Sequence, residues 1–158
     1  MQSNDVNAGA VNGKEAAYFG VPWEDASGYA RAIKVGDTID VSSQLSHDEK
    51  GNLIAPASLD ESGKPAEFSM MEQQMRATYA NAVKLLARFG ERWTTSSRIR
   101  SMSSMWIGIC RRRQGAQGSL RHRTCAGNLI GVTRLAFPEQ LIQITFKAVP
   151  SGAEAKPR

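Results

Sequence analysis

Apolar residues recur every three or four positions in one stretch near the middle of the chain. These residues are Met71, Met75, Tyr79, Ala82, Leu86 and Phe89. The polar residues expected mostly on the opposite side are Gln73, Gln74, Arg76, Asn81, Lys84 and Arg88. Ser69 and Glu72 match a capping box, and Gly90 stands where a left-handed C-cap is expected. The spacing predicts an α-helix within residues 69–90, with the methionines in a core against a second layer.

Alternation of apolar and polar residues predicts strands on both sides of this helix. Residues 141–149 alternate as a half-buried strand does, and residues 29–41 predict a hairpin that turns at Gly36-Asp37. Small polar residues at 42–44 end the second strand of the hairpin. Two further strands are expected at residues 18–23, ended by Pro22, and at residues 128–134. Strands, a helix and strands again predict an α+β fold, with a helix packed on a sheet.

The length of 158 residues is enough for one domain with its own core. We expect a flexible arm over residues 1–17, a single domain over residues 18–149 and a polar tail over residues 150–158. With two cysteines, no apolar leader and no membrane-length apolar run, the sequence predicts a cytoplasmic protein that does not enter a membrane. His47 and His122 lack metal-ligand spacing, so both are expected at the surface and no metal site is predicted.

The net charge of +5 comes from one segment of the chain. Eight arginines and no acidic residue lie between Arg92 and Cys125, and subtracting these eight leaves the rest of the chain at −3. Residues 111–113 are consecutive arginines that could grip RNA phosphates, but no aromatic platform accompanies them. Nucleic-acid binding is therefore ranked third among the functional hypotheses, after the two that are given below. Cys125 has no patterned histidine or acid beside it, so a nucleophilic role is not predicted.

Several short motifs resemble the Rid family of reactive enamine and imine deaminases. Ser27-Gly28-Tyr29-Ala30-Arg31-Ala32 resembles the family's Gly-Pro-Tyr-Ser-Gln-Ala element, and Val41-Ser42-Ser43-Gln44 resembles its Val-Ser-Gly-Gln strand end. Residues 73–90 resemble the family's first helix, and residues 131–135 followed by 141–149 resemble its last strand pair. The order and spacing of these motifs extend the resemblance over about residues 20–90 and 126–149.

The resemblance implies a chorismate-mutase-like α+β fold, in which helices cover one face of a mixed β-sheet. It also implies a homotrimer with three clefts between subunits and no metal or organic cofactor. The implied activity is hydrolysis of reactive enamines or imines to carbonyl compounds and ammonia. The alternative is a non-enzymatic trimer of the same fold, a small-ligand binder or a chaperone. Both hypotheses name further copies of this chain and a small molecule as partners.

Four residues are candidates for ligand contact on the basis of this resemblance. Tyr29 and Ser42 fall on cleft positions, and their ordinary alternatives are a strand tyrosine and a strand-end serine bound to backbone. Gly127 falls where the family holds the substrate carboxylate with an arginine, and Asn128 could present its amide there or serve as a turn residue. The family's late glutamate falls on Thr145. The chain thus resembles a subgroup without that arginine.

Residues 91–125 do not resemble the family as written. Residues 93–97 can be encoded by codons that, read one base out of frame, give leucine, two aspartates and two valines. Members of the family continue with such residues after the first helix. We hypothesise that this segment is an out-of-frame reading of the family's central strand and second helix, which the DNA sequence would test. In the chain as written, the segment would have to place its arginines in the core, at a cost on the order of several kcal/mol for each unpaired one, or leave the core open. These arginines are Arg98, Arg100 and Arg111 to Arg113.

Overall fold

A single sheet and one long helix make up most of the computed structural model, which describes residues 10–11, 13–92, 96–103 and 126–149. The elements are β1 Ala10–Val11, β2 Lys14–Ala17, α1 Pro22–Ser27, β3 Ala32–Val35, β4 Thr38–Gln44, α2 Met71–Ala87, β5 Ser96–Ser103, β6 Ala126–Gly131 and β7 Ile142–Ala148. The strand order is β1-β2-β3-β4-β7-β5-β6. Neighbouring strands are antiparallel except β5 and β6, which are parallel, so the sheet is mixed as predicted.

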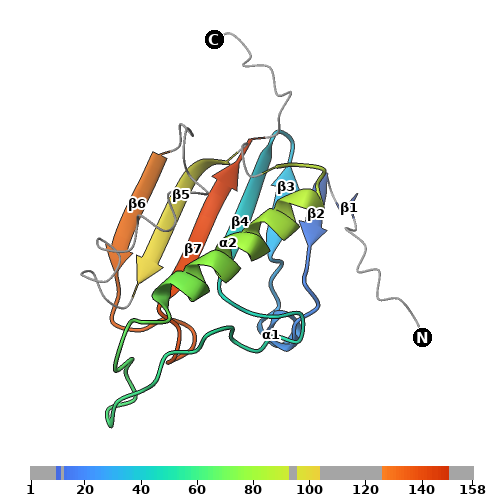
Figure 1. Ribbon diagram of the computed structural model, residues 1–158. Coiled ribbons are helices and arrows are strands. Elements are labelled where there is room, and N and C mark those ends of the chain that lie inside the picture. Colours follow the sequence, from blue (N-terminus) through green and yellow to red (C-terminus); the bar gives the residue numbers. More distant parts are fainter. Residues whose placement is uncertain (1–9, 12, 93–95, 104–125, 150–158) are drawn as a thin grey trace.

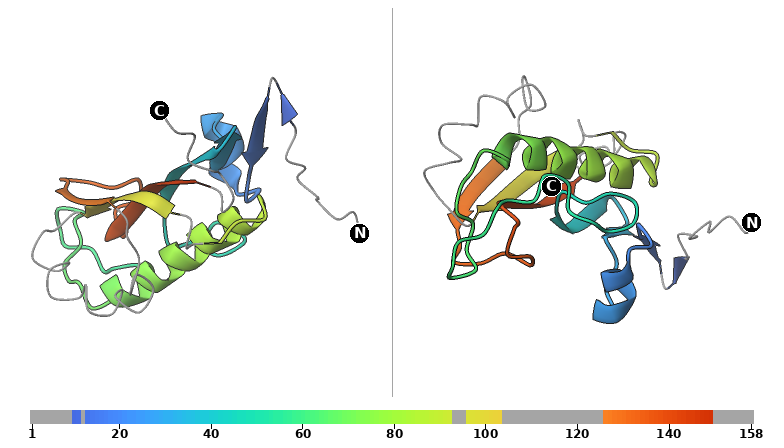
Figure 2. Two further views of the ribbon diagram at one scale, coloured as in Figure 1. Left: turned by 90° about the horizontal axis from the view of Figure 1, so that it is seen from above. Right: turned by 60° about the horizontal axis from the view of Figure 1, so that its bottom comes forward.

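The helix α2 lies across one face of the sheet, and its apolar side packs on β4 and β7 (Figures 1 and 2). Side chains alternate between buried and more exposed along β7, which confirms the predicted half-buried strand. Met71, Met75 and Tyr79 are buried in the core between helix and sheet, as their spacing predicts. The predicted α+β arrangement is therefore confirmed, with the core on one side of the sheet.

The turn between β3 and β4 has two residues, as the sequence predicts. Val35 pairs with Thr38, so Gly36 and Asp37 connect the two strands. Gly36 has a φ of 53°, a left-handed conformation that glycine adopts without steric cost. The second strand continues to Gln44, where the small polar residues were expected to end it.

The two ends of α2 differ in how well the sequence predicted them. The capping box is wrong in its position, because Met70 and not Ser69 occupies the N-cap, and the Met70 side chain makes no capping hydrogen bond. The amide of Ser69 instead bonds Glu67, 2.9 Å from its Oε2. The C-terminal prediction is confirmed, because Gly90 has a φ of 71° and its amide bonds the carbonyl of Ala87. The amide of Glu91 reaches back to Leu86, which completes a Schellman motif.

Two polar residues of α2 lie on the opposite side from the one predicted. Gln74 is fully buried and Asn81 is 5% exposed. The amide of Asn81 donates to the carbonyls of Leu45 and His47, each at 3.0 Å. A carboxamide can satisfy backbone groups of loops packed beneath a helix, and this is why polar residues stand on the inner face.

The N-terminal region differs most from the prediction. Lys14–Ala17, expected within a flexible arm, is a strand paired with β3, and the strand expected over residues 18–23 is absent from the described structure. Pro22 begins the helix α1, because proline is favoured in the first helical turn, where its missing N–H costs nothing. The four residues of β2 show no alternation of apolar and polar side chains, and the strand pairs with both β1 and β3.

Part of the basic segment belongs to the sheet. The strand β5 lies between β7 and β6, one place from the edge of the sheet. Residues 93–95 and 104–125 lie outside the described part of the chain, and so do the predictions on Arg111 to Arg113, His122 and Cys125. Within the described residues, no helix has the length and apolarity needed to cross a bilayer, and no cluster of metal-binding side chains occurs.

Candidate functional site

The end of α1 positions Tyr29 and Arg31 beside the start of the sheet. Gly28 ends the helix with a φ of 63°, and its amide bonds the carbonyl of Glu24. The backbone of Arg31 then joins the sheet just before β3, because its amide bonds Ala17 and its carbonyl accepts from the amide of Ser42, both at 3.0 Å. This backbone pairing directs the Arg31 side chain into the protein, where it is fully buried.

Arg31 contacts polar atoms at each of its three guanidinium nitrogens. Nε lies 3.1 Å from Oε1 of Glu24, an ion pair that is not aligned as a hydrogen bond. Nη1 donates to the Tyr29 hydroxyl at 3.0 Å and to the Ser43 carbonyl at 3.1 Å. Nη2 lies 3.1 Å from Nε2 of His47. Burial lowers the pKa of Arg31 from its ordinary value, although Tyr29 and Glu24 oppose this shift.

Aromatic rings enclose the guanidinium of Arg31. The ring centres of Phe19, Trp23 and Tyr29 each lie 5.8 Å from its central carbon, within the range of a cation–π contact. His47 packs edge-on against two of these rings, Phe19 and Trp23. Together these contacts hold the arginine in one conformation and keep water away from it.

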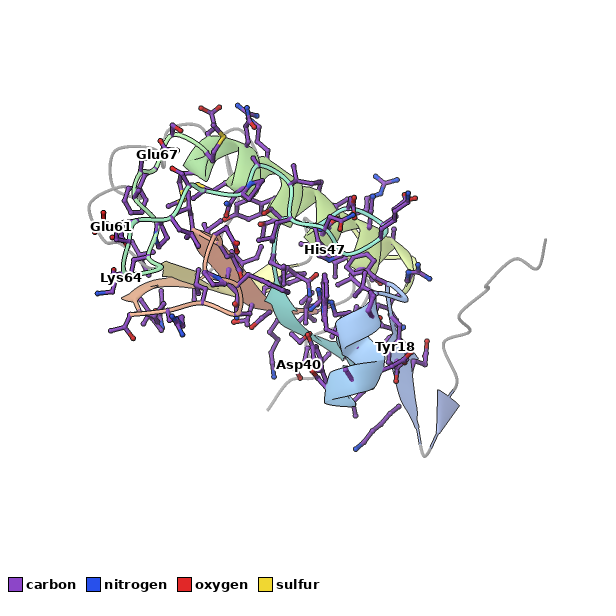
Figure 3. All side chains as sticks on the ribbon, turned by 90° about the horizontal axis from the view of Figure 1, so that it is seen from below. Tyr18, Asp40, His47, Glu61, Lys64 and Glu67 are labelled. Atoms are coloured by element: carbon purple, nitrogen blue, oxygen red, sulfur yellow. The ribbon has the colours of Figure 1, made fainter. Side chains whose placement is uncertain are left out.

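The position of His47 differs from the prediction, which put it at the surface. Its side chain lies between α1 and α2 and is only 3% exposed (Figure 3). Because a guanidinium can only donate, Nε2 of His47 must accept from Arg31, and Nδ1 then carries the proton and donates to the Asp48 carbonyl at 2.7 Å. Burial lowers the pKa of His47 below its ordinary value, and the nearby charge of Arg31 adds to this effect.

Glu24 balances the buried charge of Arg31. It is 3% exposed, and its carboxylate accepts from the amides of Phe19 and Gly20 at 2.8–3.1 Å. A buried carboxylate with two backbone donors and a cation beside it is adequately solvated by the protein. The cluster of Glu24, Arg31, Tyr29 and His47, which we call the arginine cluster, thus pairs its buried charges, although Nε of Arg31 makes no hydrogen bond.

Tyr29 and Ser42 lie near each other, as candidates for one site should. The Tyr29 side chain is 36% exposed, and Arg31 Nη1 links its hydroxyl to the carbonyl of Ser43. The hydroxyl of Ser42 donates to the Arg31 carbonyl at 3.0 Å, which is the backbone-bound role given as the ordinary alternative. The pairing of β4 with β7 is irregular between Val41 and Gln44, and such bulges are frequent next to active sites.

Thr145, at the position of the family's glutamate, lies opposite this bulge. Its neighbours Ile144 and Phe146 pair with Gln44 and Val41, so the threonine stands beside Ser42 and Ser43. Ile144 and Phe146 are buried under α2, and Thr145 therefore faces the other side of the sheet, which α2 does not cover.

Gly127 and Asn128 are on β6, at the far edge of the sheet. Both are exposed, and they pair with Ile99 and Arg100 of β5. Three strand spacings separate β4 from β6, or about 14 Å, so one chain does not bring these residues to Ser42. Asn128 lies within the strand and is not the turn residue of the alternative reading.

A separate cleft of about 550 Å³ opens between the loop after β4 and the second half of α2. Phe19, His47, Asn81 and Lys84 are among its lining residues, and none of the four predicted site residues lines it. Its rim carries both signs of charge, since Nζ of Lys84 lies 3.8 Å from Oε1 of Glu49. An exposed pair of this kind gives the cleft no strong preference for an anion or a cation.

Arg31 and His47 were not among the residues that the sequence analysis selected. Arg31 occupies an alternating position in a predicted hairpin, where a charged residue is normally solvent-exposed. Its buried partner Glu24 belongs to a helix that the sequence did not predict. One feature of the sequence could have identified Arg31. It stands two residues after Tyr29, where the family motif has a glutamine.

Comparison with known proteins identifies the fold. Neither a protein-family model nor a curated protein matches the sequence. Among solved structures, a member of the YjgF/YER057c/UK114 family from Mycobacterium tuberculosis has a TM-score of 0.65 and 19% identity, covering 86% of this chain and 98% of that one. RidA from an Antarctic Psychrobacter has a TM-score of 0.62 and 16% identity over 77% of this chain and 87% of that one.

A third structure in this group carries a different functional name. It is a candidate endoribonuclease from Thermotoga maritima, with a TM-score of 0.65 and 18% identity over 78% of this chain and 87% of that one. At these identities the likeness concerns the fold. The chain therefore has the fold of the YjgF/YER057c/UK114 proteins, the Rid fold that its short motifs led us to expect.

Proposed function

We propose that this chain is a Rid-family protein that works as a homotrimer. In each cleft between subunits, it would hydrolyse reactive enamines or imines to carbonyl compounds and ammonia. The observation that carries this proposal is the gathering of Tyr29, the bulge at Ser42 and Ser43, and Thr145 on an open part of a Rid-type sheet. These are the places that the sequence motifs assign to the family's cleft.

A trimer accounts for the separation of the predicted site residues. Ser42 on β4 and Asn128 on β6 cannot meet within one chain, because β7 and β5 lie between their strands. A neighbouring copy that presents its β6 edge to the bulge would bring the two halves together. The face of the sheet that α2 leaves open provides a surface for such a neighbour (Figure 2).

The chemistry needs little from the protein beyond orientation. An imine carbon is attacked by water, and a hydrogen bond to the imine nitrogen or to a substrate oxygen makes that attack easier. The Tyr29 hydroxyl is the polar group placed for this task, since Tyr29 is partly exposed and the guanidinium of Arg31 holds its oxygen. Gly127 offers no side chain to grip a carboxylate, so we expect altered specificity relative to amino-acid-derived imines.

An imine-hydrolysis assay tests this proposal. A flavin-dependent oxidase generates an imine continuously, and ammonia release is followed with and without the protein. We expect faster release with the protein and a slower rate with Tyr29→Phe, whereas the exposed loop substitution Lys64→Ala should change nothing. If the protein gives no acceleration for imines from either amines or amino acids, the enzymatic proposal is wrong.

The non-enzymatic alternative has its own supporting observation. Gly127 and Thr145 replace two functional positions of the family, so a trimer of this fold could retain the cleft and bind a carbonyl compound without hydrolysis. This alternative predicts that small oxo acids raise the melting temperature although ammonia release is unchanged. Loss of that shift in Tyr29→Phe would place the ligand at the same site.

RNA binding is the third hypothesis, and the name of the Thermotoga protein gives a reason to test it. Binding through the arginine-rich segment should weaken steeply as salt is raised, because it depends on phosphate contacts. We expect no gel shift of a single-stranded RNA at physiological salt. A shift that disappears at higher salt would instead support nucleic-acid binding.

A further inference from the structure

The hydroxyl of Tyr29 stands at the end of an ordered chain of hydrogen bonds. The carbonyl of Asp48 accepts from His47 at 2.7 Å, His47 accepts from Arg31 at 3.1 Å, and Arg31 donates to the Tyr29 oxygen at 3.0 Å. The last residue, Tyr29, is 36% exposed, whereas His47 and Arg31 are buried. The chain thus connects the protein interior with the surface where a ligand is proposed to bind.

The direction of every bond in this chain follows from the guanidinium of Arg31. A guanidinium has only donors, so the Tyr29 oxygen is an acceptor towards it. The hydroxyl of a tyrosine that accepts in this way still has its own hydrogen to donate. A cationic partner also polarises the O–H bond, which makes the hydroxyl a stronger donor.

Arg31 cannot easily leave this position. Glu24 lies beside Nε, three aromatic rings surround the guanidinium, and the side chain is fully buried. Rotating it out would leave Glu24 buried without its cation, which is strongly unfavourable. The donor role of Tyr29 is therefore built into the folded state before any ligand arrives.

We propose that Arg31 is a positioning residue that makes the Tyr29 hydroxyl a hydrogen-bond donor to the ligand. The ligand consequently presents an acceptor at this point, such as a carbonyl oxygen, a carboxylate oxygen or an imine nitrogen. This inference deepens the proposed function and rests on its claim that Tyr29 lines the cleft. It adds a residue, Arg31, that acts on the ligand only through Tyr29.

A double-mutant cycle separates this role from a structural one. Binding of pyruvate, a small oxo acid with three acceptor oxygens, is measured by ligand-observed NMR for wild type, Tyr29→Phe, Arg31→Lys and the double variant. We expect each single variant to bind roughly ten-fold more weakly, which corresponds to one lost hydrogen bond to a charged or polarised group. The double variant should bind no more weakly than Tyr29→Phe.

The control is Arg76→Lys, because Arg76 is an exposed arginine paired with Glu72 on the outer side of α2. Its pyruvate affinity should equal that of wild type. Losses that add in the double variant would overturn the inference, because Arg31 would then act independently of the Tyr29 hydroxyl. If wild type does not bind pyruvate, the donor role of Tyr29 towards oxo acids is wrong, whereas the proposed imine hydrolysis is decided separately by the ammonia-release assay.

A measurement on the wild type tests the positioning without a ligand and without a variant that might misfold. The Tyr29 ring carbon that bears the oxygen is followed by ¹³C NMR as His47 is titrated with acid. The charged groups around His47 come from four segments. They are Glu24 from α1, Arg31 before β3, Asp48 and Glu49 of its own loop, and Lys84 and Arg88 from α2 and its C-terminal end. Protonation of Nε2 would break its bond to Arg31, so the Tyr29 signal should move with the same midpoint as the His47 ring. A Tyr29 signal unaffected by that titration would overturn the positioning role of Arg31.

Discussion

The buried charges of Glu24 and Arg31 determine the hydrogen bonds and the protonation states of the residues around them. Glu24 is buried, and its carboxylate bonds backbone amides just before α1. His47 can accept from Arg31 only while it is neutral. The arginine cluster therefore joins α1, the start of β3 and the loop after β4 through interactions that depend on protonation.

The stability of the protein should fall in mild acid because of His47. Its pKa is lowered in the folded state by burial and by Arg31, from an ordinary value of 6.5 in the unfolded chain. Below about pH 6.5 the unfolded state binds more protons than the folded state, so the free energy of unfolding decreases as the pH falls. The contribution is complete above pH 6.5 and is lost by at most about 1.4 kcal/mol per pH unit on acidification.

Urea unfolding between pH 7.5 and 5 measures this effect. His47→Gln keeps an acceptor near Arg31 but does not titrate, so its unfolding free energy should vary less with pH than that of wild type. Equal slopes for the two proteins would show that His47 is not held neutral by the fold.

Gly51 provides a second prediction at the residue scale. It has a φ of 92°, and a β-carbon there would lie 2.6 Å from Cζ3 of Trp23, whose ring packs edge-on against His47. Gly51→Ala combines a strained backbone with displacement of this ring and should cost about 2–4 kcal/mol.

Gly63→Ala is the matched control for this substitution. Gly63 has a φ of 71° but no atom within 4 Å of the β-carbon position, so only the backbone strain of about 1–2 kcal/mol remains. Both losses are read from urea unfolding at pH 7.5. Equal losses for the two variants would show that the Trp23 ring is not packed against Gly51.

At the scale of elements, α2 is fastened to two loops by side-chain amides as well as by its apolar face. Gln74 donates to the carbonyls of Ala55 and Glu139 at 2.8 and 2.9 Å and accepts from the amide of Leu141 at 2.8 Å. These contacts hold the chain entering β7 against the helix. Both Ala55 and Glu139 belong to irregular segments, whose backbone groups would otherwise be unsatisfied.

Replacing Gln74 by leucine should destabilise the protein strongly. The side chain has a similar size, but three buried backbone groups lose their partners, which should cost about 2–4 kcal/mol in the free energy of unfolding. Gln73→Leu, one residue away on the exposed side of α2, should change it by less than about 0.5 kcal/mol. Denaturant unfolding of both variants measures these changes, and similar losses of unfolding free energy would contradict the role assigned to Gln74.

The elements that the sequence predicted correctly pack against the core on one side only, so their apolar and polar residues follow a regular pattern. The alternation along β7 and the Gly36-Asp37 turn are local signals, and both are confirmed. The helix α1 and the strand β2 were missed because six and four residues are too few to show a period. Gln74 and Asn81 were assigned to the exposed side because their backbone partners are far away in sequence.

The candidate site was predicted in part for a similar reason. Tyr29 and Ser42 were selected from motif positions, and in the structure each forms a hydrogen bond with Arg31. Arg31 was missed because its burial depends on Glu24, His47 and aromatic rings from three other segments. Whether Gly127 and Asn128 share a site with Tyr29 depends on a second copy of the chain, which a single sequence does not describe.

At the scale of the whole molecule, α2 covers one face of the sheet, and no long helix among the described residues covers the other face. Ala32 is buried under α2, so the next residue, Ile33, lies on the open face, where it is 37% exposed. Val35, two residues further, is 48% exposed on the same face. Apolar side chains on an otherwise uncovered sheet are typical of a surface that meets another subunit.

Ile33→Asp should therefore dissociate the proposed trimer without unfolding the chain. The charge would be buried against a neighbour in the trimer but would face water in a monomer. Val83→Asp is the matched control, because Val83 is 45% exposed but lies on the helix that covers the opposite face. Size-exclusion chromatography with light scattering reports the mass, and circular dichroism reports the fold. Equal masses for the two variants would exclude this face as the interface.

The association of copies around shared clefts is the central claim, and native mass spectrometry of the wild-type protein tests it most directly. The chain has a mass of 17.2 kDa, and the account predicts one dominant species at three times this value. A protein that remains at the mass of a single chain at micromolar concentration would contradict the account, since Tyr29 and Asn128 could then never face the same ligand.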